Sequence, residues 1–167
     1  GPALPFYAAR FPKAFPASLL APASAAATEL QLAGSISCGD HERSGDTSDV
    51  RSGAVQQLGH DAPDMLYRFV VRKTCTVTVD LCESEYDSAV RVLSADGLVE
   101  YARNDDDVSC CDRRDDKELR SAVNMHCPYS KIQSLELEPG EYVVQVEGYS
   151  RYEGKFNLKL LCESSCV

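Results

Sequence analysis

The eight cysteines of this 167-residue chain constrain its fold more than any other feature. They are Cys38, Cys75, Cys82, Cys110, Cys111, Cys127, Cys162 and Cys166. A structural zinc site would place cysteines in C-x-x-C pairs or beside histidines at fixed spacings, and the sequence has neither pattern. An even number of cysteines without metal-binding spacing is typical of disulfides formed in an oxidising compartment. We therefore predict a secreted or cell-surface protein with four disulfides.

The spacing of the cysteines limits how they pair. Cys75 and Cys82 flank a strand-like run, which in extended form holds them about 23 Å apart. They are not expected to be partners, because the Cα atoms of bonded cysteines lie within about 7 Å of each other. The adjacent Cys110 and Cys111 are expected to bond to two different partners, Cys82 and Cys127. The remaining four cysteines would link the start of the domain to its end: Cys38, Cys75, Cys162 and Cys166.

Size, charge and hydropathy exclude several classes of protein. The length suits one domain, and 44% hydrophobic with 26% charged residues is ordinary for a globular protein. Seventeen Lys and Arg against 26 Asp and Glu give a net charge of −9, which would repel nucleic acid and anionic lipid surfaces. The most apolar stretch, 19–27, is short and contains Pro22, so no segment is expected to span a membrane.

The first part of the chain differs from the rest. Residues 1–27 contain ten alanines and five of the eight prolines, and no cysteine. The repeated prolines prevent a long helix, so we predict an extended linker or docking segment over 1–33 and a folded domain over 34–167. Several large apolar residues exceed what a solvated linker needs and favour docking on the domain or on a partner: Phe6, Tyr7, Phe11, Phe15, Leu19 and Leu20.

After the first segment the sequence is typical of strands and turns. Short runs rich in Val, Thr, Tyr and Leu alternate with Gly, Asp, Asn and Pro, and no segment has a sustained helical period. Expected strands lie at 29–38, 65–71, 75–81, 88–94, 98–103, 134–137, 142–148 and around 156–160. Asp96-Gly97 predicts one hairpin, and Pro139-Gly140 predicts another with a type II turn. The pattern indicates an all-β antiparallel β-sandwich, jelly-roll-like and cross-linked by disulfides.

The order of several short motifs over residues 34–162 resembles the bacterial-type pre-peptidase C-terminal (PPC) domains, in a cysteine-rich form found in algal and other microbial surface proteins. The motifs are Ile36-Ser37-Cys38-Gly39-Asp40, Asp64-Met65-Leu66-Tyr67-Arg68-Phe69, Tyr86-Asp87-Ser88, Asn104-Asp105-Asp106 and Pro139-Gly140-Glu141-Tyr142. The resemblance implies a compact sandwich without catalytic residues, appended to secreted peptidases or surface proteins, that recognises polymers or assists secretion. The chain is similar also to the collagen-binding modules of clostridial collagenases, which bind calcium. It departs from simple members in its four potential disulfides and its long loop 105–128.

An acidic loop is the candidate metal site. Asn104, Asp105, Asp106 and Asp107 are consecutive, and Asp87 at a neighbouring strand start could join them. Hard cations such as Ca²⁺ take six to eight oxygen ligands, which closely spaced carboxylates supply. The run lacks the EF-hand pattern. The alternative is a solvated loop whose aspartates cap turns.

A tyrosine-containing loop is the candidate ligand-binding site. Tyr149 and Tyr152 flank Arg151, and exposed Tyr and Arg are enriched at recognition surfaces. They would stack on sugars or hold an extended polypeptide; alternatively, the tyrosines fill strand ends. The absence of Trp weakens the case for binding a crystalline polysaccharide.

The sequence does not predict an enzyme. His41, His60 and His126 are the available bases, and none lies in a recognisable catalytic motif. We predict a non-catalytic extracellular recognition or adhesion module of a larger secreted or cell-surface protein, which binds a polymer or a protein partner. One alternative is a polysaccharide-binding, lectin-like module. A second is a structural assembly unit of an extracellular matrix or surface appendage, in which residues 1–27 pack against a neighbouring copy.

Overall fold

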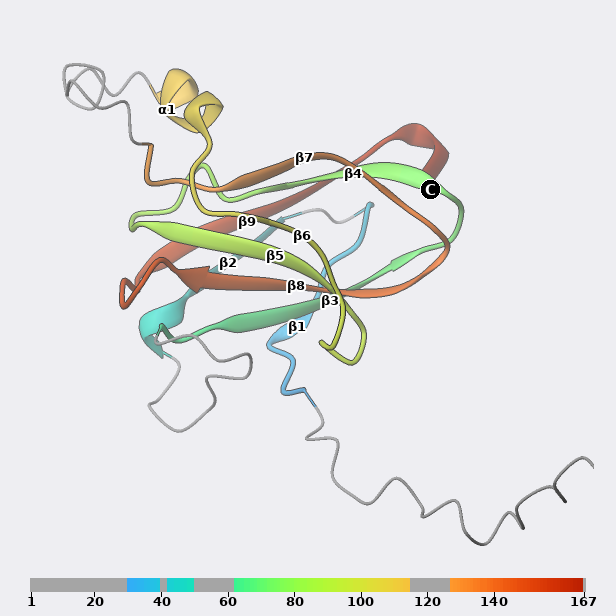
Figure 1. The fold of residues 1–167 in the computed structure, drawn as a ribbon, viewed down its shortest axis with the longest axis horizontal. Coiled ribbons are helices and arrows are strands. Elements are labelled where there is room, and N and C mark those ends of the chain that lie inside the picture. Colours follow the sequence, from blue (N-terminus) through green and yellow to red (C-terminus); the bar gives the residue numbers. More distant parts are fainter. Residues whose placement is uncertain (1–29, 40–41, 50–61, 115–126, 167) are drawn as a thin grey trace, which may run out of the picture.

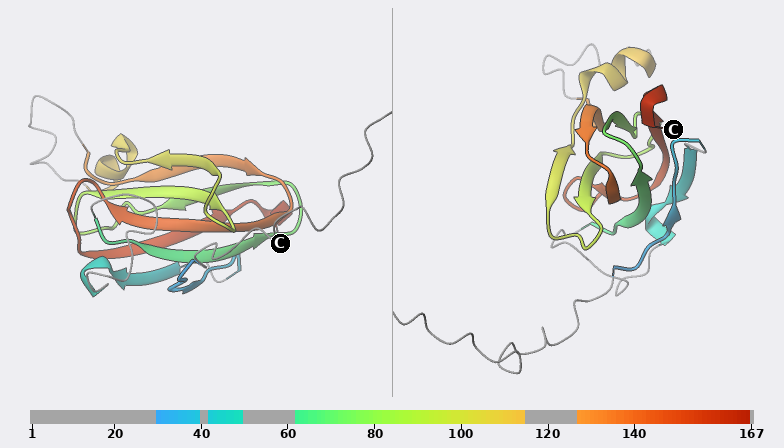
Figure 2. Two further views of the ribbon diagram at one scale, coloured as in Figure 1. Left: turned by 60° about the horizontal axis from the view of Figure 1, so that its bottom comes forward. Right: turned by 90° about the vertical axis from the view of Figure 1, so that its right-hand side faces the viewer.

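Two β-sheets packed face to face form the body of the domain (Figures 1 and 2). The computed structural model describes residues 30–39, 42–49, 62–114 and 127–166. The strands are β1 (Gly34–Ser35), β2 (Glu42–Asp46), β3 (Met65–Val71), β4 (Cys75–Asp80), β5 (Ser88–Ser94), β6 (Glu100–Asn104), β7 (Lys131–Leu137), β8 (Gly140–Gly148) and β9 (Lys155–Cys162). The five-stranded sheet has the order β1-β3-β8-β5-β6 and the four-stranded sheet the order β2-β9-β4-β7. The predicted all-β sandwich is therefore confirmed.

Alternating side chains place the core between the sheets. In β3, Tyr67, Phe69 and Val71 are buried in this core, whereas Arg68 and Val70 are exposed. The four-stranded sheet contributes buried side chains from β4 and β9 in the same alternating way. A smaller apolar cluster is separate from this core and contains Leu66, Leu93 and Val143, with the partly buried Leu30 against it. The central strand β8 is consequently buried from Tyr142 to Gly148.

The predicted Asp96-Gly97 hairpin is present between β5 and β6, which pair antiparallel. Gly97 has a φ of 76°, a left-handed conformation that glycine adopts without strain. The Asp96 carboxylate accepts a hydrogen bond from the Leu98 amide at 3.0 Å, and the Ser94 amide donates to the Val99 carbonyl at 2.9 Å. These bonds hold the turn between the two strands.

The predicted hairpin at Pro139-Gly140 is wrong. Strand β7 pairs with β4 in the four-stranded sheet, whereas β8 pairs with β3 and β5 in the other sheet, so the connection crosses between the layers. Gly140 is also not one of the two described glycines with positive φ, Gly97 and Gly154, so the turn is not type II. The Tyr142 hydroxyl donates to the Glu138 carbonyl at 2.6 Å and fixes this corner. β8 is buried on both faces as an interior strand of the five-stranded sheet. The residues of a turn do not show which sheet the following strand joins.

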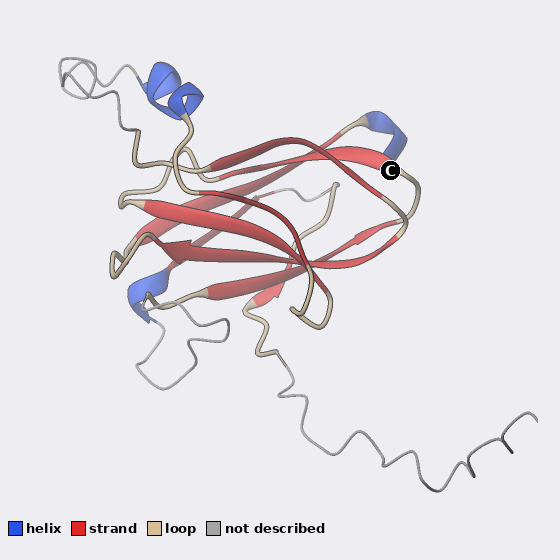
Figure 3. Ribbon diagram, in the orientation of Figure 1, coloured by secondary structure: helices blue, strands red, loops and turns tan. Residues whose placement is uncertain are grey.

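Other departures concern short elements. The first strand is limited to β1, and it pairs with β3 in parallel, so the fold is not purely antiparallel. Strand β2 was not predicted, because its sequence ERSGD has no apolar alternation. Helix α1 (Val108–Arg114) was not predicted either, because seven residues are too few for a helical period (Figure 3). The strand order does not establish the jelly-roll-like connectivity.

All eight cysteines are paired in the structure. The disulfides are Cys38–Cys162, Cys75–Cys166, Cys82–Cys110 and Cys111–Cys127. This agrees with separate partners for the adjacent cysteines and with links from the start to the end of the domain. Because Cys75 and Cys82 flank β4, two disulfides lie at each end of the sandwich.

The predicted segment 1–33 is described only from residue 30, so its role as a linker or docking segment lies outside the described residues. Among the helices that the structure does describe, none has the length and apolar character needed to cross a membrane.

Candidate functional site

A groove of about 310 Å³ lies where β5 begins and where β6 and β8 end. We call it the β5–β6–β8 groove. Its lining residues are Ala89, Val90, Arg91, Arg103, Asn104, Asp105, Glu147, Gly148, Tyr149 and Ser150. The groove thus contains members of both loops that the sequence predicts to be functional, the acidic loop and the tyrosine loop.

Strand register places the polar residues of the groove together. Arg91 on β5 lies opposite Gln145 on β8 and opposite Arg103 on β6. Glu147 is two residues from Gln145, so both side chains project from the same face of β8. The intervening Val146 points into the core instead. Alternation along two neighbouring strands therefore gathers charged side chains on the face of the sheet opposite the main core.

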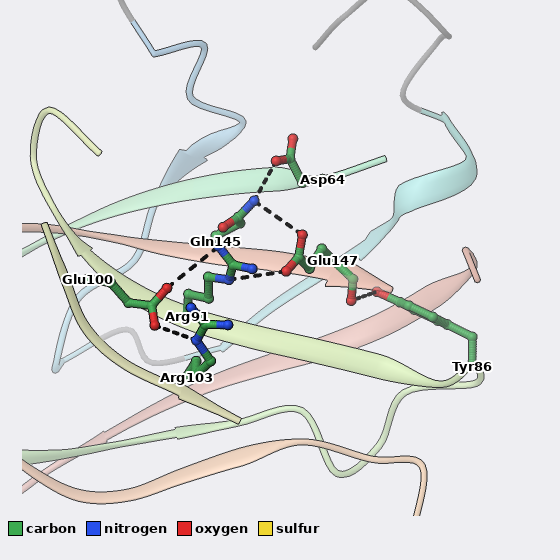
Figure 4. Close-up of polar contacts among 7 residues, drawn as sticks. All are labelled: Asp64, Tyr86, Arg91, Glu100, Arg103, Gln145 and Glu147. Atoms are coloured by element: carbon green, nitrogen blue, oxygen red, sulfur yellow. Dashed lines mark hydrogen bonds and ion pairs between the residues drawn. The ribbon is translucent and has the colours of Figure 1, made fainter. Parts of the chain in front are cut away.

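These side chains form a network of ion pairs and hydrogen bonds (Figure 4). Arg91 Nε lies 3.3 Å from Glu147 Oε1, and Arg91 Nη1 lies 3.6 Å from Glu100 Oε2. Arg103 donates to the other oxygen of Glu100. Glu100 therefore bridges two arginines whose positive charges would otherwise repel each other across the strand pair. The Arg91 and Glu147 side chains are almost completely buried.

The side-chain amide of Gln145 extends this network to Asp64. Gln145 Nε2 donates to Asp64 Oδ2 at 2.6 Å and lies 3.4 Å from Glu147 Oε2. The Tyr86 hydroxyl donates to the Glu147 carbonyl at 3.4 Å. Burial raises the pKa of Glu147 to about 7, the charge of Arg91 opposes this rise, and the charge of Asp64 adds to it. Burial likewise raises the pKa of Asp64, although the hydrogen bond from Gln145 lowers it.

The raised pKa of Glu147 makes its contribution to stability depend on pH. Between the ordinary carboxyl pKa and about 7, the folded state keeps a proton that the unfolded chain has released. The free energy of unfolding contributed by this group therefore falls as pH rises through that window and is constant above it. The opposite sign holds for carboxylates with lowered pKa, such as Asp46 and Asp96.

We predict that Glu147→Gln stabilises the domain relative to the natural chain by about 2 kcal/mol at pH 8. The difference should shrink to near zero at pH 4.5, where the natural carboxyl is protonated as well. Urea denaturation of both proteins at several pH values measures it. A stability difference that does not change with pH would contradict the assignment.

The tyrosine loop connects β8 to β9. The Tyr149 amide donates to the Asp87 carbonyl at 2.9 Å, and the Tyr152 amide donates to the Tyr149 carbonyl at 3.1 Å. A Cβ on Gly148 would lie 1.6 Å from the Tyr152 carbonyl oxygen, so only glycine allows this close turn. Tyr149 lines the groove with 53% of its surface exposed, whereas Arg151 and Tyr152 are exposed but do not line it.

Hydrogen bonds within the chain occupy two residues of the acidic loop. Asn104 Oδ1 accepts from the Lys131 amide at 3.1 Å, and Asn104 Nδ2 donates to the Asp106 carbonyl at 3.1 Å. These bonds tie the end of β6 to the start of β7. Asp105 lines the groove beside Asn104.

The other two candidate metal ligands also have structural contacts. Asp107 Oδ1 accepts from the Ser109 amide at 2.9 Å and from the Ser109 hydroxyl, so Asp107 caps the start of α1. Asp87 holds the tyrosine loop through its carbonyl. Among the described residues, the sole group of three acidic, histidine or cysteine side chains within reach of one ion is Cys38, Cys162 and Cys166. These cysteines are in disulfides and offer no thiolate.

Sequence reasoning missed the buried network. Arg91, Gln145 and Glu147 lie within predicted strands, and the sequence analysis assigns them no function. The available signal was a charged residue inside the apolar run SAVRVLS of β5. The histidines considered as bases, His41, His60 and His126, lie outside the described residues.

Comparison with known proteins gives a structural match alone. No protein-family model matches the chain, and no curated protein matches it. Among solved structures, it is similar to the pre-peptidase C-terminal domain of collagenase from Bacillus anthracis, with 14% sequence identity and a TM-score of 0.42. The match covers 78% of this chain and 96% of that domain. That domain bears the same family name as the PPC domains that residues 34–162 resemble.

Proposed function

We propose that this chain is a non-catalytic extracellular recognition module of a larger protein and that the β5–β6–β8 groove binds its ligand. The observation that carries the proposal is the convergence of Asp105 and Tyr149, from loops far apart in sequence, beside the buried Arg91–Glu147 pair. The four disulfides favour an oxidising, extracellular location. A rigid sheet with fixed polar groups also suits recognition, because little order must be gained on binding.

The lining of the groove favours a neutral polysaccharide among the possible polymers. Arg91 and Arg103 are both neutralised by glutamates, and Asp105 adds a negative charge, so an anionic polymer would be repelled. Ser150 supplies a hydroxyl, and the Asn104 amide keeps one N–H and one lone pair beyond its bonds to Asp106 and Lys131. The exposed ring of Tyr149 offers a face for a sugar. This supports the lectin-like alternative.

A binding experiment with oligosaccharides tests the proposal. We expect the domain to bind neutral probes, chitohexaose or cellohexaose, more tightly than polygalacturonate in isothermal titration. Tyr149→Ala should weaken this binding about tenfold or more, as expected for an aromatic anchor. Tyr101→Ala is the matched control, since Tyr101 is 47% exposed and does not line the groove. Preference for polygalacturonate, or equal loss in both variants, would refute the assignment.

Calcium binding by the acidic loop remains a prediction of the sequence. If Asp105 and Asp106 ligate the ion, millimolar calcium should raise the melting temperature by several degrees relative to chelator, because saturation at a hundred times the dissociation constant adds about 2.7 kcal/mol. The rise should disappear in Asp105→Ala/Asp106→Ala. No rise in the natural protein would contradict calcium binding by these two residues.

A protein partner and assembly into an extracellular matrix or surface appendage stay as alternatives. The assembly hypothesis depends on residues 1–27, which lie outside the described residues. Self-association in analytical ultracentrifugation that disappears when residues 1–27 are deleted would favour it over the groove.

A further inference from the structure

Two disulfides lie close together at the end of the sandwich that holds the C-terminal residues. Cys38–Cys162 and Cys75–Cys166 are separate bonds, but the Sγ atoms of Cys38, Cys162 and Cys166 all lie within 4.8 Å of one another. Disulfides exchange when a thiolate attacks a neighbouring disulfide sulfur. A thiolate released at Cys162 would therefore have Cys166 within immediate reach.

A second groove is lined by one cysteine of each of these two disulfides. It has a volume of about 420 Å³ and lies beside the segment 35–39 and the end of β3, with both Cys38 and Cys166 in its lining. Cys38 and Cys162 are partly exposed, whereas Cys75 and Cys166 are each 4% exposed. An external thiol therefore meets the Cys38–Cys162 bond more readily than the Cys75–Cys166 bond, and the groove leads it to Cys38.

The charge of this groove favours the same reaction. Arg72 and Arg68 lie in its lining, and Arg68 is paired with Glu141. A guanidinium in this groove attracts an anionic thiol, although the whole chain carries a net charge of −9.

We propose that Cys38 is a site of covalent modification by a low-molecular-weight thiol, and that exchange between the two adjacent disulfides retains the modification. The thiolate attacks Cys38 Sγ, so a mixed disulfide forms and Cys162 leaves as a thiolate. Cys162 then attacks Cys166 Sγ, a Cys162–Cys166 bond forms, and Cys75 leaves and takes up a proton. The thiol consumed balances the thiol released at Cys75, so no external oxidant is needed.

The second step is what distinguishes this site from an ordinary disulfide. A released thiolate normally attacks the mixed disulfide, which expels the external thiol and restores the original bond. At this site Cys162 has an alternative target in Cys166, which competes with the return reaction. The product replaces bonds that span 124 and 91 residues with one between residues four apart, so it frees segment 36–39 from β9 and frees the start of β4.

Peptide mapping tests the proposal. The oxidised natural protein is incubated with reduced glutathione as the probe, alkylated with N-ethylmaleimide at mildly acidic pH to stop exchange, and digested without reduction. We expect glutathione on Cys38, the alkyl group on Cys75 and a Cys162–Cys166 cross-link in the same molecules. Three results would overturn the proposal. They are glutathione on Cys38 with the Cys75–Cys166 bond intact, glutathione mainly on another cysteine, and no adduct.

Paired variants test the role of the second disulfide. Cys75→Ser/Cys166→Ser removes the alternative target, so the yield of the Cys38 adduct should fall about tenfold as the return reaction prevails. Cys111→Ser/Cys127→Ser removes a disulfide at the opposite end and should leave the yield unchanged. An equal yield in both variants would contradict retention by exchange, and the mapping of the natural protein decides the case if the first variant does not fold.

Discussion

Reduction of all four disulfides should abolish the cooperative thermal unfolding of this domain. In the chain-entropy description, the bond spanning 124 residues contributes about 5 kcal/mol and the bond spanning 16 residues about 3 kcal/mol. Measured values are typically 2–4 kcal/mol for each bond, so their sum rivals the whole net stability of about 5–15 kcal/mol of an ordinary domain. The measurement is a circular dichroism melt in strong reductant at neutral pH. An unchanged cooperative melt would show that the disulfides do not hold this fold together.

A comparison of two double variants refines this result. Cys38→Ser/Cys162→Ser removes a bond that closes a loop of about 40 residues while Cys75–Cys166 is intact. Cys111→Ser/Cys127→Ser removes a bond that closes a loop of 16 residues at α1. The first variant should lose more stability, by about 1 kcal/mol, because the longer loop restricts the unfolded chain more. Urea denaturation of both variants measures the difference, and the reverse order would contradict the entropic explanation.

Phe69→Ala should produce the largest loss of stability among single substitutions in β3. Phe69 is 2% exposed, and its ring stacks on Tyr142 with centroids 5.5 Å apart. Truncation removes this contact and leaves a cavity between the sheets, which typically costs about 3–5 kcal/mol. Urea denaturation of the oxidised protein measures this loss.

Val70→Ala is the matched control for this substitution. Val70 is the next residue in the same strand, but its side chain points away from the core and is 45% exposed. We expect a loss below about 1 kcal/mol, typical of surface positions. Similar losses in the two variants would contradict the placement of the core between the sheets.

The sequence predicted the parts of the fold that depend on local patterns. β3 and β5 begin and end where alternating or continuous apolar runs begin and end, because each run buries one or both faces of a strand. The Asp96-Gly97 turn was predicted because a left-handed residue is needed there. The strand predicted at 29–38 is limited to β1, and β2 was not predicted because its sequence is short and polar; pairing with β3 and β9 stabilises these two strands.

The candidate site was only partly predictable for a related reason. Asp105 and Tyr149 were recognised because polar and aromatic loop residues are visible in a sequence. Arg91 and Glu147 were not, because the alternation of a strand shows which residues share a face but not which strands become neighbours. Their ion pair depends on β5 lying beside β8, a contact between strands separated by about fifty residues of chain.

The most direct test of the central claim, recognition through the β5–β6–β8 groove, is an amide chemical-shift titration of the isotopically labelled, oxidised domain with chitohexaose. We predict shifts concentrated at residues 103–105 and 147–150, which line the groove, with little change at the hairpin 95–99 on the opposite end of β5. The assignment of the groove as the recognition site would be contradicted by shifts concentrated at the hairpin or around residues 35–39. It would also be contradicted by the absence of shifts at a saturating concentration of chitohexaose.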